Sequence, residues 1–122
     1  PSFSRATVAQ TQSGRRLVFV SGTAAIKGHA TIAAGDLDAQ LDCTLDNLRL
    51  ISRAASLGDA LGAEASTARH FKVYLRDPAT YRRVRDRLEA EFVQASDHVT
   101  YLQAEVCRAA LEVEIEATLV GR

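Results

Sequence analysis

Residues 111–120 read LEVEIEATLV, and this stretch decides the fold. Apolar and polar residues alternate in it without interruption, as in a β-strand with one buried face. The apolar set is Leu111, Val113, Ile115, Ala117 and Leu119, and the polar set is Glu112, Glu114, Glu116 and Thr118. Because side chains alternate across a strand, three carboxylates stand in a row opposite the core. That polar face is either simply solvated or the wall of a pocket that uses one of the carboxylates.

Four further segments of the chain are expected to form strands. Residues 98–107 (HVTYLQAEVC) precede Arg108-Ala109-Ala110, so they form a closing pair of strands with 111–120. Residues 3–11 predict a first strand, and 17–20 (LVFV) predict a short strand buried on both sides. Residues 69–76 predict a strand whose faces differ. Phe71, Val73 and Leu75 lie on one face, and His70, Lys72, Tyr74 and Arg76 on the other.

Two amphipathic helices separate these strands. The first begins at Asp36, a good N-cap, carries apolar residues at three- and four-residue steps, and ends at Gly58. Asp77-Pro78 starts the second helix. Its expected core stripe is Tyr81, Val84, Leu88 and Phe92. Its arginine-rich 82–87 segment is expected to be a solvated face, with Arg82–Asp86 and Arg85–Glu89 pairs.

The resulting order is β-β-α-β-α-β-β, which predicts an α+β fold with a mixed sheet. Two helices can cover only one face of such a sheet. The other face would carry a patterned set of polar residues, and burial against sister subunits is the economical explanation for it. The sequence therefore predicts a homo-oligomer with its sites where subunits meet.

Composition narrows the classes of function. With 122 residues the chain is expected to be one domain (1–122), and its 15 basic and 15 acidic residues give no reason to propose a nucleic acid or membrane partner. Cys43 and Cys107 are expected to be free thiols in a reducing, cytoplasmic compartment. No His/Cys cluster has metal spacing, so neither a metal nor a cofactor is expected. The start at Pro1-Ser2 fits a removed initiator Met or a fragment equally well.

Several segments together resemble the Rid/YjgF family. They are Leu17-Val18-Phe19-Val20-Ser21-Gly22, a helix with Gln40 and Asn47-Leu48, and Val113-Glu114-Ile115-Glu116-Ala117. The resemblance implies a chorismate-mutase-like fold and a homotrimer with three clefts between subunits. Many members are imine deaminases that hold a substrate carboxylate with an arginine. The position that matches this arginine is Val99, and the position that matches the family's water-positioning glutamate is Glu114. The chain therefore has the expected acid but lacks the expected carboxylate-binding arginine.

A narrower resemblance is to the C-terminal half of the chorismatases. Its two runs are Ser21-Gly22-Thr23-Ala24-Ala25-Ile26-Lys27-Gly28-His29 and Cys107-Arg108 followed by Leu111 and Val113-Glu114-Ile115. It implies cleavage of chorismate to pyruvate and a cyclic carboxylate. Glu114 would be the acid/base, and Cys107 matches a cysteine of the hydroxybenzoate-forming branch. Substrate binding would fall to Arg108, Lys72, Tyr74, Gly22, Thr23 and Ala25.

The implied chemistry is physically reasonable, because an enol ether is cleaved after a carboxylic acid protonates its methylene carbon. Simpler interpretations stand beside it. Glu114 could be a solvated strand residue, Cys107 a core residue, and Lys72 with Tyr74 part of an ion-pair network at a subunit boundary. Two other functions also stay open: an imine deaminase with another carboxylate anchor, and a non-catalytic accessory protein that binds a small carboxylated metabolite.

Overall fold

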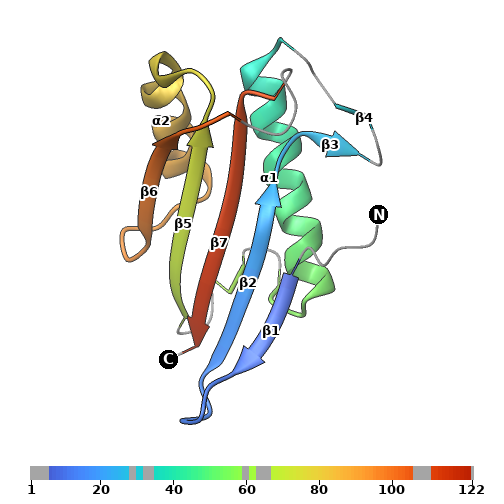
Figure 1. Ribbon diagram of the computed structural model, residues 1–122, viewed down its shortest axis with the longest axis vertical. Coiled ribbons are helices and arrows are strands. Elements are labelled where there is room, and N and C mark those ends of the chain that lie inside the picture. Colours follow the sequence, from blue (N-terminus) through green and yellow to red (C-terminus); the bar gives the residue numbers. More distant parts are fainter. Residues whose placement is uncertain are drawn as a thin grey trace.

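A computed structural model describes residues 6–27, 30–31, 35–58, 61–62, 67–105 and 111–121. Five of its strands form one sheet in the order β1-β2-β7-β5-β6, and both helices lie on the same side of that sheet (Figure 1). This arrangement confirms the predicted α+β class with a mixed sheet. The strands are β1 (Ala6–Gln10), β2 (Arg16–Thr23), β5 (Thr67–Leu75), β6 (His98–Gln103) and β7 (Val113–Gly121). The other elements are the small hairpin β3 (Ile26–Lys27) and β4 (Ala30–Thr31), the helices α1 (Leu37–Ala54) and α2 (Tyr81–Glu91), and the 3-10 turn Pro78–Thr80.

The two last strands do not pair with each other, although the sequence suggests a closing pair. Strand β5 pairs in parallel with β6 and antiparallel with β7, so it separates the two. The crossover through α2 places β6 on the outer edge of the sheet. Strand β7 takes the central position, where its continuous apolar row can be buried.

The core lies between the sheet and the two helices. The apolar row of β7 is at most 3% exposed, and it packs with β5 residues and with leucines of α1. The expectation that residues 17–20 are buried on both sides is wrong. Val18 and Val20 are buried, but Phe19 is 45% exposed because the helices cover only the other face of the sheet.

Helix α1 begins as predicted and ends earlier than predicted. The Asp36 carboxylate accepts a hydrogen bond from the Ala39 N–H at 3.0 Å, which satisfies a free donor of the first turn. The helix ends at Ala54 rather than beside Gly58. Ser56 already has a positive φ of 60°, so the chain leaves the helix before the glycine is reached.

The start and the core stripe of α2 also differ in detail from the prediction. Asp77 caps the 3-10 turn, and the α-helix starts only at Tyr81. Val84 and Leu88 are buried as expected, whereas Tyr81 is 37% exposed and stacks edge-on against Tyr101, with 4.9 Å between ring centroids.

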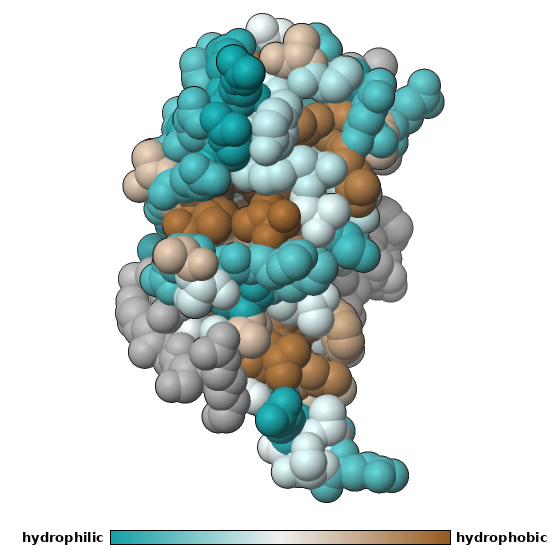
Figure 2. All heavy atoms as spheres, turned by 90° about the vertical axis from the view of Figure 1, so that its left-hand side faces the viewer, coloured by the Kyte–Doolittle hydropathy of each residue, from teal (hydrophilic) through white to brown (hydrophobic). Residues whose placement is uncertain are grey.

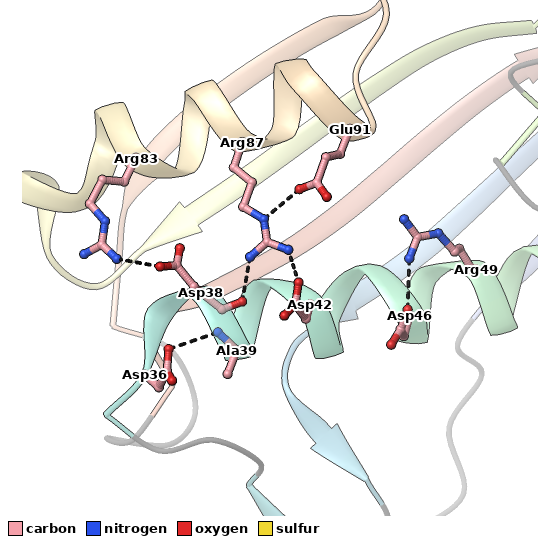
Figure 3. Close-up of polar contacts among 9 residues, drawn as sticks. All are labelled: Asp36, Asp38, Ala39, Asp42, Asp46, Arg49, Arg83, Arg87 and Glu91. Atoms are coloured by element: carbon pink, nitrogen blue, oxygen red, sulfur yellow. Dashed lines mark hydrogen bonds and ion pairs between the residues drawn. The ribbon is translucent and has the colours of Figure 1, made fainter.

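Two arginines of α2, Arg83 and Arg87, reach across to α1 (Figure 3). Arg83 pairs with Asp38 at 3.2 Å, and Arg87 bonds the Asp38 carbonyl, the Asp42 carboxylate and Glu91. Arg85 pairs with the adjacent Asp86 at 2.9 Å rather than with Glu89. The predicted solvated face is therefore partly a helix–helix contact.

Candidate functional site

Three of the predicted site residues lie side by side on the face of the sheet that the helices leave open. Tyr74 on β5 is the register partner of Glu114 on β7, and Lys72 is the partner of Glu116. Glu114 and Tyr74 are partly buried, and Lys72 is exposed. Glu114 thus has a phenol beside it, and Glu116 has an ammonium.

Glu114 lies against Gly22 on its other side. A Cβ atom built on Gly22 would stand 2.6 Å from the carboxyl carbon of Glu114 and 2.8 Å from its Oε2. Thr23 and Ala25 are 3% and 0% exposed, and the Thr23 hydroxyl donates to the Ser21 carbonyl at 3.0 Å. Of these three predicted binding residues, Gly22 is the one that the structure places against Glu114.

Tyr74, Glu116 and Lys72 form a polar cluster beside Glu114. Burial raises the pKa of Tyr74, and the charge of Glu116, a hydrogen bond to it and the charge of Glu114 raise this pKa further. The phenol therefore stays neutral and can donate a hydrogen bond at ordinary pH. The Lys72 ammonium lies 3.7 Å from a carboxylate oxygen of Glu116.

The segment that leads into Glu114 is held from both sides. The Gln40 side-chain oxygen accepts from the Glu112 N–H at 2.8 Å, and Arg76 donates from Nε to the Leu111 carbonyl at 2.9 Å. The Arg76 N–H also donates to the Glu112 carbonyl at 3.1 Å. These hydrogen bonds fix the backbone on both sides of residue 112. They therefore also fix where β7 starts and where Glu114 lies along the strand.

Helix α1 also holds the segment that follows Gly22. Asn47 donates from Nδ2 to the Ala24 carbonyl at 2.9 Å. Cys43, Ala24, Ala25 and Leu111 form a small second core cluster. Cys43 is thus a buried free cysteine as expected, and it packs where the two site segments meet.

Sequence reasoning did not assign these holding roles to Gln40 and Asn47. The available signal was an amide within the leucine-rich helix face at Gln40, and a second amide one heptad later at Asn47. An amide on an apolar helix face predicts a buried hydrogen-bond partner, because burying it unpaired is costly.

Other predicted residues are not brought to Glu114. Val99 pairs with Phe71 and packs against the core on the helix side of the sheet, so its side chain does not lie on the face of Glu114. Cys107, Arg108 and His29 lie outside the described residues.

A separate hollow lies where β6 and the start of α2 meet. It encloses about 490 Å³ and is lined by Leu75, Pro78, Tyr81, Tyr101, Leu102 and Gln103. Figure 2 looks onto the side of the molecule that carries β6 and α2, where apolar patches interrupt a mostly hydrophilic surface. The described lining of this hollow offers no carboxylic acid, whereas the row with Glu114 does.

No helix among the described residues combines the length and the apolar character that crossing a bilayer requires.

No protein-family profile matches the chain. Curated proteins do match it. The chain is 35% identical over 126 residues to a 3-hydroxybenzoate synthase from Streptomyces hygroscopicus and 36% identical over 125 residues to a chorismatase from Streptomyces rapamycinicus. Each match covers 98% of this chain but only 37% and 36% of the relatives, so the chain spans about a third of their length.

Solved structures give the same picture. A crystal structure of a chorismatase matches with a TM-score of 0.75 and 30% identity, covering 97% of this chain and 36% of that one. RidA from an Antarctic Psychrobacter species matches with a TM-score of 0.71 and 18% identity, over 98% of this chain and 88% of that one. The YjgF protein of E. coli matches with a TM-score of 0.66 and 21% identity, over 87% and 81%. The chain therefore has the YjgF/RidA fold and is homologous to about one third of the chorismatase and 3-hydroxybenzoate synthase chains.

Proposed function

We propose that this chain is a chorismatase-like enzyme that hydrolyses a carboxylated enol ether, with Glu114 as the proton donor. The observation that carries the proposal is the placement of Glu114 between Gly22 and Tyr74, on the open sheet face of a chain that aligns with chorismatases along 98% of its length. The alternative hydrolysis of an imine has less support, because valine stands at position 99, where the resemblance to the imine deaminases implies a carboxylate-binding arginine.

The proposed reaction begins with proton transfer from the Glu114 carboxylic acid to the methylene carbon of the enol ether. The resulting oxocarbenium ion takes up water at its central carbon, and the water returns a proton to the carboxylate. The hemiketal then loses the ring alcohol and leaves a 2-keto acid, which is pyruvate if chorismate is the substrate. One water is consumed, and no oxidant or reductant is needed.

Cationic and hydroxyl groups near Glu114 would bind the two carboxylates of such a substrate. Lys72 offers an ammonium and Tyr74 a neutral phenol on the same face. Arg108 would supply a guanidinium that suits bidentate carboxylate binding, and by resemblance Cys107 would assist catalysis. Both belong to the segment that leads toward β7.

We further propose that residues 1–122 form one domain of a cytoplasmic homotrimer, with the substrate cleft between copies. The open face supports association because Phe19 is 45% exposed on it and no element of the described chain covers it. Closing a second copy over Glu114 would exclude water and strengthen the electrostatic interactions of the site.

The test is a pyruvate assay with the purified chain and chorismate. Glu114→Gln removes the acid without changing its size, so kcat should fall by about 100-fold or more. Glu89→Gln on α2 is the control, because it makes the same change on the helix side of the molecule. A wild-type rate equal to that of Glu114→Gln would refute the proposal. Release of ammonia from 2-aminoacrylate above the spontaneous rate would instead identify a deaminase.

A further inference from the structure

We propose that Gly22 is a positioning residue: its missing side chain sets where the Glu114 carboxylate lies. The kinetic part of this inference rests on the proposed function. The geometric part concerns only the two residues and can be tested without any substrate.

Space, rather than backbone conformation, explains a glycine at position 22. Gly14, Gly35, Gly58 and Gly62 have positive φ angles, which favour glycine, but Gly22 is not among them. The Glu114 carboxyl group instead occupies the place of a side chain, since a Cβ on Gly22 would meet its three atoms at 2.6, 2.8 and 3.0 Å. At Gly121, another strand glycine, a Cβ would meet nothing closer than 3.6 Å.

An irregularity in β2 brings Gly22 to this position. Val20 pairs with Ala117 and Thr23 pairs with Ile115, so two residues of β2 lie opposite the single residue Glu116. Such a β-bulge bends the strand and changes the direction of its residues, and bulges occur often beside active sites. Because Tyr74 is the neighbour of Glu114 on β5, the glutamate side chain has the β2 backbone on one side and a phenol on the other.

A methyl group at position 22 would displace the carboxylate and leave the fold in place. The atoms that it meets are the far end of a flexible side chain, which can rotate away without moving the backbone. A catalytic group that is misplaced by about 1 Å can lose about 100-fold in rate. Gly22→Ala should therefore lower kcat by about that factor while its melting temperature stays close to wild type.

The experiment compares Gly22→Ala with Gly121→Ala in three measurements: kcat, melting temperature and the ¹³C resonance of the Glu114 carboxyl group at fixed pH. We expect Gly22→Ala to lose kcat and shift that resonance, with the Glu112 resonance unchanged. Gly121→Ala should change neither kcat nor the resonance. An unshifted Glu114 resonance in folded Gly22→Ala overturns the inference. If wild type turns over no substrate, the proposed function fails and the resonance alone decides this inference.

The double variant Gly22→Ala/Glu114→Asp covers the case in which Gly22→Ala does not fold. Aspartate is shorter by one methylene group and leaves room for the added methyl. Folding of the double variant without folding of the single variant would support the steric contact. Failure of both to fold would overturn the inference, because Gly22 would then serve the bulge and not the carboxylate.

Discussion

One charged residue, Arg69, lies on the buried face of β5 among apolar side chains. Arg69 is 3% exposed and donates from Nε to Asp97 at 2.9 Å, from Nη2 to the second Asp97 oxygen, and to the Phe92 carbonyl at 3.1 Å. The Gln94 N–H also donates to Asp97, at 2.7 Å. The guanidinium lies 5.0 and 5.5 Å from the centroids of Phe71 and Phe92. The Arg69–Asp97 pair thus holds the segment that connects α2 to β6.

Asp97→Asn should lower the free energy of unfolding by about 3 kcal/mol at pH 7, because it leaves Arg69 buried without a counter-charge. Burial alone raises the pKa of Asp97, but the hydrogen bonds from Arg69 and Gln94 and the charge of Arg69 hold it below its ordinary 3.8. A lowered pKa in the folded state stabilises the protein above pH 3.8, and this stabilisation is lost as the pH falls through the folded pKa.

Urea denaturation at pH 7 and at pH 3 measures this effect. The difference between wild type and Asp97→Asn should shrink at the lower pH. Asp46→Asn is the control, since Asp46 belongs to an exposed pair with Arg49. A difference that is the same at both pH values would contradict the account.

At the scale of elements, the two helices are joined by charge as well as by their packing on the sheet. Arg87 is the centre of this contact, with partners on α1 at the Asp38 carbonyl and Asp42, and with Glu91 on its own helix (Figure 3). Its side chain is only 21% exposed, which limits screening by salt. Arg87 therefore connects elements that the sequence separates by a whole strand.

Arg87→Ala should destabilise the fold by about 1 kcal/mol, the upper end of the range for surface pairs, because several partners share one guanidinium. Arg85→Ala is the matched control, since Arg85 forms its ion pair with the adjacent Asp86 on the same helix. Denaturation in low salt and in 1 M NaCl measures both variants. Equal effects of the two substitutions would show that the helix–helix contact contributes nothing.

Periodicity predicted the elements well and their contacts poorly, for a physical reason. The buried row of β7 and the N-cap at Asp36 depend on local pattern, which the sequence displays directly. The partners of Arg87 and the place of Gly22 depend on which distant segments meet. A single bulge in β2 decides the contact between Gly22 and Glu114, and no local pattern marks its register. The face of the sheet on which Glu114 lies was therefore predictable, but the residues beside it were only partly so.

At the scale of the whole molecule, the open sheet face changes character along the strands. Its polar end carries Glu114 and Tyr74, and the row of Lys72 and Glu116 follows. Next come Phe19 and Thr118 with a histidine pair, in which His70 and His98 lie edge to face at 4.6 Å. The far end pairs Val120 with Leu17 and Ala68. A partner that packs on the apolar end of this face would leave a cleft over the charged end.

If the proposed trimer forms through this face, Phe19→Lys should abolish self-association, because it replaces an exposed apolar side chain with a charge. Phe19 is 45% exposed in the single chain, so the substitution should leave the fold intact. Leu50→Lys is the matched control, since Leu50 is 53% exposed on α1, which lies on the covered side of the sheet. Sedimentation velocity measures both variants. A Phe19→Lys variant that keeps the wild-type sedimentation coefficient would contradict a subunit interface on this face.

The strand order affects when, during folding, the candidate site forms. Strand β2 comes early in the chain and β7 late, yet the sheet pairs them and makes Gly22 touch Glu114. The middle unit β5-α2-β6 can form from nearby residues, whereas the β2–β7 pairing must close a loop that contains nearly everything else. We therefore expect the carboxylate to reach its place in one of the slower steps of folding. A chain in which β2 and β7 have not yet paired would lack the contact between Gly22 and Glu114.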